Sequence, residues 1–284
     1  MSSDSSSIDI PDNFRYGNQN QIESYDPLAP APYADTYKMN HLKRGTAIIF
    51  NHVNFDISED AKREGSDKDR DDLIKMFQIL DFNVLKHNDL TVREIKKVLV
   101  TVSTMDHTDS DCLVVVVLSH GENGTLHARD GEYPTNIIWK YFTPSYCPTL
   151  AGKPKLFFIQ ACRGSKLHNS VTIPYKTNRT EEDSSSADGY YSIPVMADIL
   201  VMYSTVEGYY SWRNPDKGGY FIQSLVKQIK LHHRTRDLLT ILTFVNREVA
   251  IDFTSHQPTL PEYSGKKQMC SIVSMLTRLL YFVE

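Results

Sequence analysis

Apolar and polar positions along the chain form short blocks that predict strands and helices in alternation. Short apolar runs of the kind found in buried strands lie at residues 46–50, 82–85, 112–118, 155–159 and 199–203. Apolar residues at helical spacing predict helices over 67–80, 220–231 and 238–253, a further helix that opens on the capping box from Thr91 to Glu94, and a short helix near 137–142. Residues 269–282 have the pattern of one or two closing strands. The alternation predicts an α/β fold, in which helices flank both faces of a mostly parallel central β-sheet.

Two polar stretches interrupt this pattern. Roughly the first forty residues are rich in Ser, Asn, Asp and Pro and show no periodicity, which predicts disorder. Residues 163–192 include the acidic, serine-rich run 179–189, and this segment is too polar to pack and too long for a tight turn. We expect it to be an exposed, mobile loop, although a charge run is more often only a solvated surface.

Composition narrows the class of protein. The chain has 284 residues, 40% of them hydrophobic, and a net charge of -4, which gives no reason to expect nucleic acid or an anionic membrane as a partner. No apolar run approaches the roughly 20 residues that span a bilayer, and the N-terminus lacks a secretion signal. The four cysteines, at 112, 147, 162 and 270, show no metal-ligand spacing. A reducing, cytoplasmic setting without metal or cofactor is therefore expected.

Residues with candidate catalytic side chains come directly after two of the predicted strands. His120 comes two residues after one apolar strand, and Cys162 follows another on a glycine-containing turn. A thiol and an imidazole are the minimum equipment for covalent acyl transfer, and the carboxyl ends of parallel strands are where α/β sheets bind ligands. Taken alone, a cysteine in this position is more often a packed small hydrophobe, and His120 is more often a strand-end residue.

Other polar side chains follow the same strand ends. Arg63 lies in the loop after the first strand, Gln160 precedes Cys162, and Arg213 follows the strand at 199–203. Two guanidinium groups beside an amide suit a substrate carboxylate, because guanidinium binds carboxylate in a bidentate manner and stays charged when buried. Taken alone, these arginines would more often be surface charges.

Several motifs in the same order resemble those of the caspase family. They are Ser119-His120-Gly121-Glu122, Gly152-Lys153-Pro154-Lys155-Leu156-Phe157-Phe158-Ile159-Gln160, Gln160-Ala161-Cys162-Arg163-Gly164, Tyr210-Ser211-Trp212-Arg213-Asn214 and Phe221-Ile222-Gln223-Ser224-Leu225. The resemblance runs from about Tyr37 to the C-terminus. The N-terminal segment is too short for a death-fold adaptor domain, so the resemblance points to the executioner branch.

The resemblance implies a cysteine endopeptidase that cuts after aspartate and executes apoptosis. Cys162 would attack the carbonyl, His120 would protonate the leaving amine, and the backbone N–H groups of Gly121 and Cys162 would form the oxyanion hole. A backbone carbonyl near Ala61 would orient the histidine. The remaining substrate-binding residues would be Arg63, Gln160 and Arg213 for the aspartate, Tyr210, Trp212 and Tyr263 for the residue before it, Asn214 for an acidic residue at the fourth position, and Ser211 within the same motif.

The same resemblance implies a zymogen. The run Thr180-Glu181-Glu182-Asp183 has the acidic, aspartate-ending form that caspases cut, so cleavage after Asp183 would separate a large subunit (41–183) from a small one (184–284), within a linker at 176–192. Asp188 is the alternative site. Removal of the disordered segment 1–40 is expected after Asp12, whereas Asp26 is disfavoured because Pro27 follows it.

Expected partners are protein substrates, an upstream initiator caspase, inhibitor-of-apoptosis proteins, and a second copy that pairs through the final strand to give a dimer of large-plus-small units. Two positions depart from the family pattern. Tyr220 replaces a common tryptophan near the fourth-position pocket, and the segment from Gln268 to Ser271 lacks the usual proline.

The sequence leaves three rival functions. A catalytically silent, caspase-like decoy would bind partners without cutting them, but the chain has both Cys162 and His120. A hydrolase of the same fold that cuts after Arg or Lys would need an acidic pocket, whereas this chain places Arg63 and Arg213 there. A thiol redox protein would need a resolving cysteine near Cys162, and none lies within a few residues.

Overall fold

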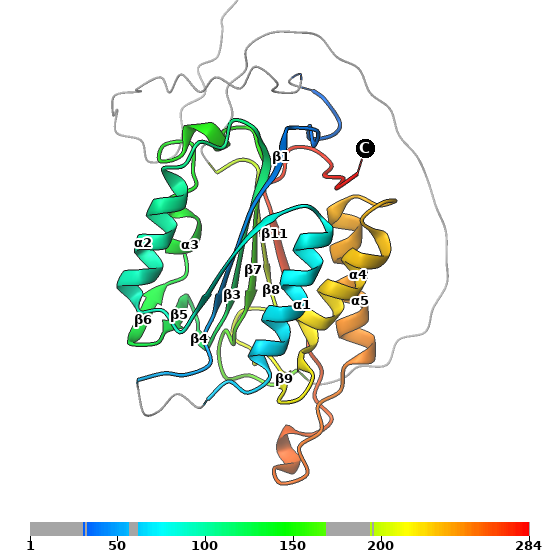
Figure 1. Ribbon diagram of the computed structural model, residues 1–284. Coiled ribbons are helices and arrows are strands. Elements are labelled where there is room, and N and C mark those ends of the chain that lie inside the picture. The colour runs from blue at the N-terminus through cyan, green and yellow to red at the C-terminus, as the bar shows by residue number, and fades with distance from the viewer. Residues whose placement is uncertain (1–30, 32, 57–61, 169–193, 195, 284) are drawn as a thin grey trace, which may run out of the picture.

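A six-stranded sheet forms the centre of the molecule. The computed structural model describes residues 31, 33–56, 62–168, 194 and 196–283. The sheet has the strand order β11-β8-β7-β3-β1-β2, in which all neighbours are parallel except β11, which runs antiparallel to β8 (Figure 1). The strands are β1 (Lys43–Asn51), β2 (Asn83–Asn88), β3 (Ser110–Leu118), β7 (Lys155–Gln160), β8 (Ile199–Tyr203) and β11 (Ser271–Ser274).

Helices cover both faces of the sheet, as predicted. One face carries α1 (Ser66–Ile79), α4 (Tyr220–His232) and α5 (Leu238–Asp252), and the other carries α2 (Val92–Ser103) and α3 (Ile137–Lys140), as Figure 1 shows. Alternate side chains of a strand therefore enter two separate cores. Val114 packs with Leu73 of α1, whereas its neighbour Val115 packs in the cluster of Ile95 and Leu99 of α2. The predicted capping box at the start of α2 is confirmed, because Thr91 and Glu94 each bind the other's backbone N–H.

Small elements beyond the strand ends complete the fold. A three-stranded antiparallel sheet joins β4 (Gly121–Glu122), β5 (Thr125–Ala128) and β6 (Gly131–Pro134), and β9 (Arg213–Asn214) pairs with β10 (Gly218–Gly219). The 3-10 helices η1 (Pro148–Leu150) and η2 (Pro261–Tyr263) lie in connections.

At the edges of the fold, two expectations need correction and a third, of one or two closing strands, is narrowed to one of its alternatives. Folded structure begins before residue 41, because Tyr37 and Met39 are buried and the Tyr37 hydroxyl donates to Asp198 at 2.6 Å. The first residues of the expected loop at 163–192 are paired, since Arg163 N–H donates to the Tyr209 carbonyl at 3.0 Å and Lys166 bridges to the same residue. Residues 269–282 contribute one strand, β11, to the described part of the sheet. In each case long-range backbone pairing overrides a locally polar or irregular sequence.

Candidate active site

The parallel pairing of β3 with β7 brings His120 and Cys162 to one edge of the sheet. Leu118 and Gln160 are register partners at the ends of these strands, and the pairing continues where Ser119 N–H donates to the Gln160 carbonyl at 3.1 Å. His120 and Cys162 each lie two residues beyond this pair. The strand-end argument from the sequence therefore places the imidazole and the thiol correctly at a common edge.

Gly121 lies where backbone must approach backbone closely. A Cβ at this position would lie 2.8 Å from the Thr125 carbonyl oxygen and 3.2 Å from that of Cys162. A Cβ atom cannot lie as close as 2.8 Å to the Thr125 carbonyl oxygen. Only glycine therefore allows this segment to lie against the turn that carries Cys162.

The thiol of Cys162 is held by the backbone of Ser211. Ser211 N–H donates to Sγ at 3.4 Å, and Sγ lies 3.7 Å from the Ser211 carbonyl oxygen as a donor. Burial raises the pKa of Cys162 above that of an ordinary thiol, although the Ser211 N–H and the charges of Arg63 and Arg213 act in the opposite direction. In this arrangement the thiol is neutral at neutral pH.

An aromatic side chain that the sequence did not single out packs on the candidate base. The rings of Phe55 and His120 have centroids 5.0 Å apart, and those of His120 and a second imidazole, His127, are 6.3 Å apart. His127 belongs to β5, and its backbone N–H donates to the His120 carbonyl at 3.0 Å. These tilted ring contacts and the backbone pairing together restrict the orientation of the His120 ring.

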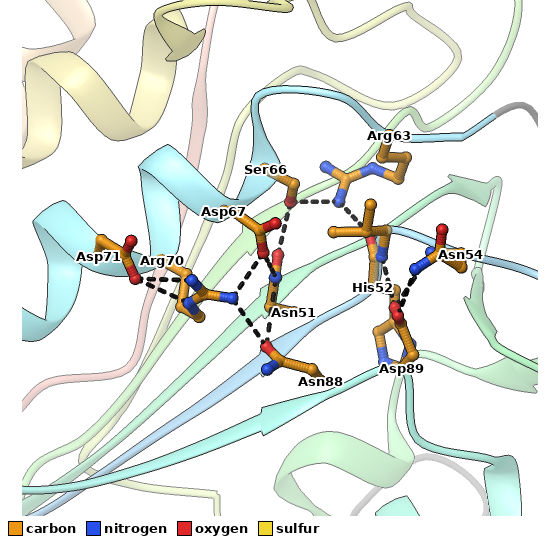
Figure 2. A network of polar contacts seen from close by, with 11 residues as sticks. Asn51, His52, Asn54, Arg63, Ser66, Asp67, Arg70, Asp71, Asn88 and Asp89 are labelled. Carbon is orange, nitrogen blue, oxygen red and sulfur yellow. Dashed lines mark hydrogen bonds and ion pairs between the residues drawn. The ribbon is translucent and has the colours of Figure 1, made fainter.

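Arg63 is held in a buried polar network, which Figure 2 shows at the start of α1. Its side chain is 1% exposed, and one terminal nitrogen donates to the His52 carbonyl at 2.8 Å and to Ser66 Oγ at 2.7 Å. Ser66 in turn donates to Asn51 Oδ1 at 2.6 Å. Burial, with the nearby charge of Arg213, lowers the pKa of Arg63 to about 9, which leaves the group charged at neutral pH.

The same network fixes the loop around Arg63 from two further sides. Asn51 Nδ2 donates to Asp67 at 2.8 Å, and Arg70 binds Asp67 at 2.5 Å, as Figure 2 shows. Asp89 accepts the backbone N–H groups of Val53 and Asn54 at 2.6 and 3.1 Å. A guanidinium that is this well supported is pre-oriented for a ligand.

Arg213 and Gln160 lie in the same cluster of polar groups. Arg213 in β9 donates through Nε to the Glu64 carbonyl at 2.7 Å, and Gln160 Nε2 donates to Ser211 Oγ at 2.7 Å. The Gln160 Oε1 atom is buried without a hydrogen-bond partner among the described residues. Asn214 Oδ1 accepts the backbone N–H groups of Asp216 and Lys217 at 2.9 Å each and closes the turn after β9.

The three residues expected to form an apolar pocket come together. Ring centroids are 6.5 Å apart for Tyr210 and Trp212, 6.1 Å for Tyr210 and Tyr263, and 6.4 Å for Trp212 and Tyr263. Phe253, which the sequence did not suggest, joins the cluster at 6.1 Å from Trp212 and 4.5 Å from Tyr220. Its apolar position at the end of a helical stripe was the only signal, and that signal is shared by every core residue.

Some sequence predictions cannot be placed. Asp12, Asp183, Asp188 and Ala61 lie outside the described residues. Within residues that the structure does describe, no helix is both long and apolar enough to cross a bilayer, and no three His, Cys, Asp or Glu side chains gather as metal ligands.

Known proteins share this sequence and fold. The caspase-domain family model matches residues 44–281. Caspase-1 of Drosophila melanogaster is 47% identical over 88% of this chain and 76% of its own length, and caspase-3 of Mesocricetus auratus is 42% identical over 88% of each. Caspase drICE of Drosophila melanogaster is 44% identical over 89% of the chain and 74% of its own length. The crystal structure of caspase-1 from Spodoptera frugiperda superposes with a TM-score of 0.82 at 45% identity, over 90% of this chain and 98% of that one.

Proposed function

This chain belongs to the caspase family and is a cysteine-type endopeptidase of the effector class, an executioner of apoptosis, and we propose that Cys162 and His120 are its catalytic pair. The observation that carries the proposal is their common position, two residues beyond the register partners Leu118 and Gln160. The decoy alternative finds no support in the family matches.

The reaction follows from the chemistry of these groups. The thiol gives its proton to His120 as sulfur attacks the carbonyl carbon, and a C–S bond forms. The C–N bond breaks as His120 returns the proton to the leaving amine, which leaves a thioester on Cys162. Water then attacks the thioester with His120 as base, and the free carboxyl product and the thiol result. The backbone N–H groups of Gly121 and Cys162 would bind the oxyanion, which typically contributes a few kcal/mol.

The substrate side chain would be aspartate. Arg63 and Arg213 supply two buried or half-buried guanidiniums, and the Gln160 side chain adjoins them. A neutral isostere would leave these donors unpaired, and sites built in this way can reject analogues by about 10⁴-fold. Tyr210, Trp212 and Tyr263 would receive the apolar residue before the aspartate. The Asn214 Oδ1 closes the turn after β9, and its Nδ2 group would donate to the acidic residue at the fourth position.

A direct experiment compares the full-length protein with its Cys162→Ala form on tetrapeptides Asp-Glu-Val-X, with X as Asp, Asn, Glu or Arg. We expect self-processing and turnover of the Asp peptide alone, both absent in the alanine form. Intact protein without turnover, even after artificial cleavage at Asp183, would favour the decoy, and turnover of the Arg peptide would mean that the pocket assignment is inverted.

Activation by cleavage after Asp183 is part of the proposal. The contact of Ser211 with the Cys162 thiol supports it, because the Ser211 backbone contacts the sulfur that must attack the carbonyl. Cleavage in the linker would let the segment that carries Ser211 move away. Asp183→Ala should slow processing and change the fragment masses, while Asp188→Ala should leave both unchanged. Equal behaviour of the two variants would exclude Asp183 as the principal site.

Pairing of two units through β11 is also proposed. β11 lies at the edge of the sheet, and its Val273 is 46% exposed. An exposed apolar edge strand favours pairing with a second copy. Val273→Lys should shift the protein from dimer to monomer in analytical ultracentrifugation, and an unchanged dimer would contradict this role for the edge. An initiator caspase, inhibitor-of-apoptosis proteins, cleavage after Asp12 and a cytoplasmic location stay predictions.

A further inference from the structure

A buried carboxylate on α1 lies behind the two pocket arginines. Asp69 is 1% exposed, and both of its oxygens accept the backbone N–H of Gly219, at 3.0 and 2.8 Å. It lies four residues before Leu73, so it occupies the buried stripe of the helix where an apolar residue would ordinarily pack. The catalytic scheme makes no use of this carboxylate.

The group that Asp69 holds belongs to the hairpin of Arg213. Gly219 in β10 is the register partner of Arg213 in β9. The hairpin approaches Asp69 so closely that a Cβ on Gly218 would lie 2.0 Å from Asp69 Oδ1, and Gly218 has a φ of +89°. The Asp69 carboxylate and the positive φ therefore both exclude any residue larger than glycine at position 218.

The same contact reaches the third pocket residue. A Cβ on Gly219 would lie 2.6 Å from Gln160 Oε1 and 3.2 Å from Asp69 Oδ2, so the Gly219 backbone fills the space between the two side chains. Asp69 thus fixes a segment that contacts Gln160 directly and carries Arg213 on its partner strand.

The charges agree with this arrangement. Burial lowers the pKa of both Arg63 and Arg213, and the charge of Asp69 acts in the opposite direction; the two arginines likewise act to lower the pKa of Asp69. Burial is the larger influence on the carboxyl and raises its pKa to about 7. Among the contacts of the described residues, the hydrogen bonds of Arg63 and Arg213 go to His52, Ser66 and Glu64, and no ion pair within 4 Å joins Asp69 to either arginine, so Asp69 takes none of the guanidinium donors.

We propose that Asp69 is a positioning residue for recognition of the substrate carboxylate: it ties the β9–β10 hairpin to α1 and so holds Arg213 beside Arg63 and Gln160. The proposal rests on the pocket assigned under the proposed function. Loss of the tie would loosen Arg213 without touching Cys162 or His120.

The test measures KM and kcat for the tetrapeptides Asp-Glu-Val-Asp and Asp-Glu-Val-Glu. The enzyme is expressed at full length and then processed by cleavage. Asp69→Ala removes both acceptors, and we expect it to raise KM for the Asp peptide about tenfold or more, to leave kcat within about threefold, and to reduce the preference for Asp over Glu. Asp69→Asn keeps one acceptor for Gly219 N–H, so its KM should return to within about threefold of the wild-type value. Asp71→Asn, an exposed change on the same helix, is the control.

A second variant breaks the same contact from the hairpin side. Gly218→Ala places a methyl group against Asp69 Oδ1 and should raise KM as Asp69→Ala does. Gly152→Ala is the matched control, because Gly152 also has a positive φ, of 72°, but a Cβ there would meet nothing within 4 Å. The rate at which iodoacetamide alkylates Cys162 should be equal in all five variants and the wild type.

Two results would overturn the proposal. One is an Asp69→Ala enzyme with KM and Asp-over-Glu preference within twofold of the wild type. The other is a decrease in kcat and in the alkylation rate, together with an increase in KM, in both Asp69→Ala and Asp69→Asn. That result would indicate a general structural role for Asp69. A wild-type enzyme without preference for Asp would instead refute the proposed function, so the two failures are distinguishable.

Discussion

The backbone of Ser211 brackets the sulfur of Cys162, with its N–H 3.4 Å and its carbonyl oxygen 3.7 Å from Sγ. In the uncleaved chain, the sulfur of the nucleophile is therefore in contact with the backbone of the same chain. Because burial also raises the pKa of the thiol, the reactive thiolate is scarce at neutral pH.

Alkylation of the uncut protein by iodoacetamide should be slow at pH 7 and should still accelerate as the pH passes 9. A raised thiol pKa leaves less thiolate at pH 7 than an ordinary cysteine has. Mass spectrometry of the modified Cys162 peptide gives the rate, and Cys162→Ala gives the background from the other, buried cysteines. A rate that levels off near pH 7 would show that the resting thiol is already activated.

Ser66→Ala should lower stability and weaken substrate binding together. The change leaves a buried donor of Arg63 and the Oδ1 acceptor of Asn51 without a partner, at a cost of about 1–3 kcal/mol. Denaturant unfolding and KM for the Asp peptide measure the two effects. Thr101→Ala, an exposed hydroxyl change on α2, should alter neither. Unchanged KM in Ser66→Ala would mean that Arg63 does not depend on this support.

Phe55→Ala should lower kcat by about tenfold with little change in KM, because the ring packs on His120 and restricts its orientation. Phe55→Tyr keeps the ring and should retain most of the activity. Steady-state kinetics on the Asp peptide separates the two parameters. A raised KM at constant kcat would place Phe55 in substrate binding instead.

Stability should fall as the pH drops from about 6.5 to 4, partly because of His52. Burial, aided by the charge of Arg63, lowers its pKa from 6.5 to about 4. Over this window the unfolded chain takes up a proton that the native imidazole cannot accept, so the stabilisation present above pH 6.5 is lost, by about 3 kcal/mol if the whole shift is realised. His52→Asn should flatten the Tm profile between these pH values, while the exposed His256→Asn should not. An identical slope in both variants would assign the effect to other groups.

The sequence was sufficient where one rule of geometry decides the outcome. Parallel strands bring their carboxyl ends to one edge, so His120 and Cys162 could be placed from two apolar runs alone. The Thr91 capping box was equally local, because both partners lie within one turn.

The supports of the site were not accessible in this way. Asn51 and Ser66 look like loop residues until α1 packs beside β1, and the contact of Phe55 with His120 joins segments that are far apart in the chain. Asp69 did leave a trace, as a carboxylate on the buried stripe of α1, but the surrounding run of charged residues concealed it. Interactions between segments far apart in the chain set these positions.

The pairing of β7 with β8 decides whether the two fragments stay together after the chain is cut. Five register pairs, from Lys155 with Ile199 to Ile159 with Tyr203, join the strand before Cys162 to the first strand of the following region. A break in the chain between these strands would sever none of their ladder. The two fragments should migrate as one species in a native sizing column and separate only in denaturant, because a cut between β7 and β8 adds two chain ends and leaves the sheet intact.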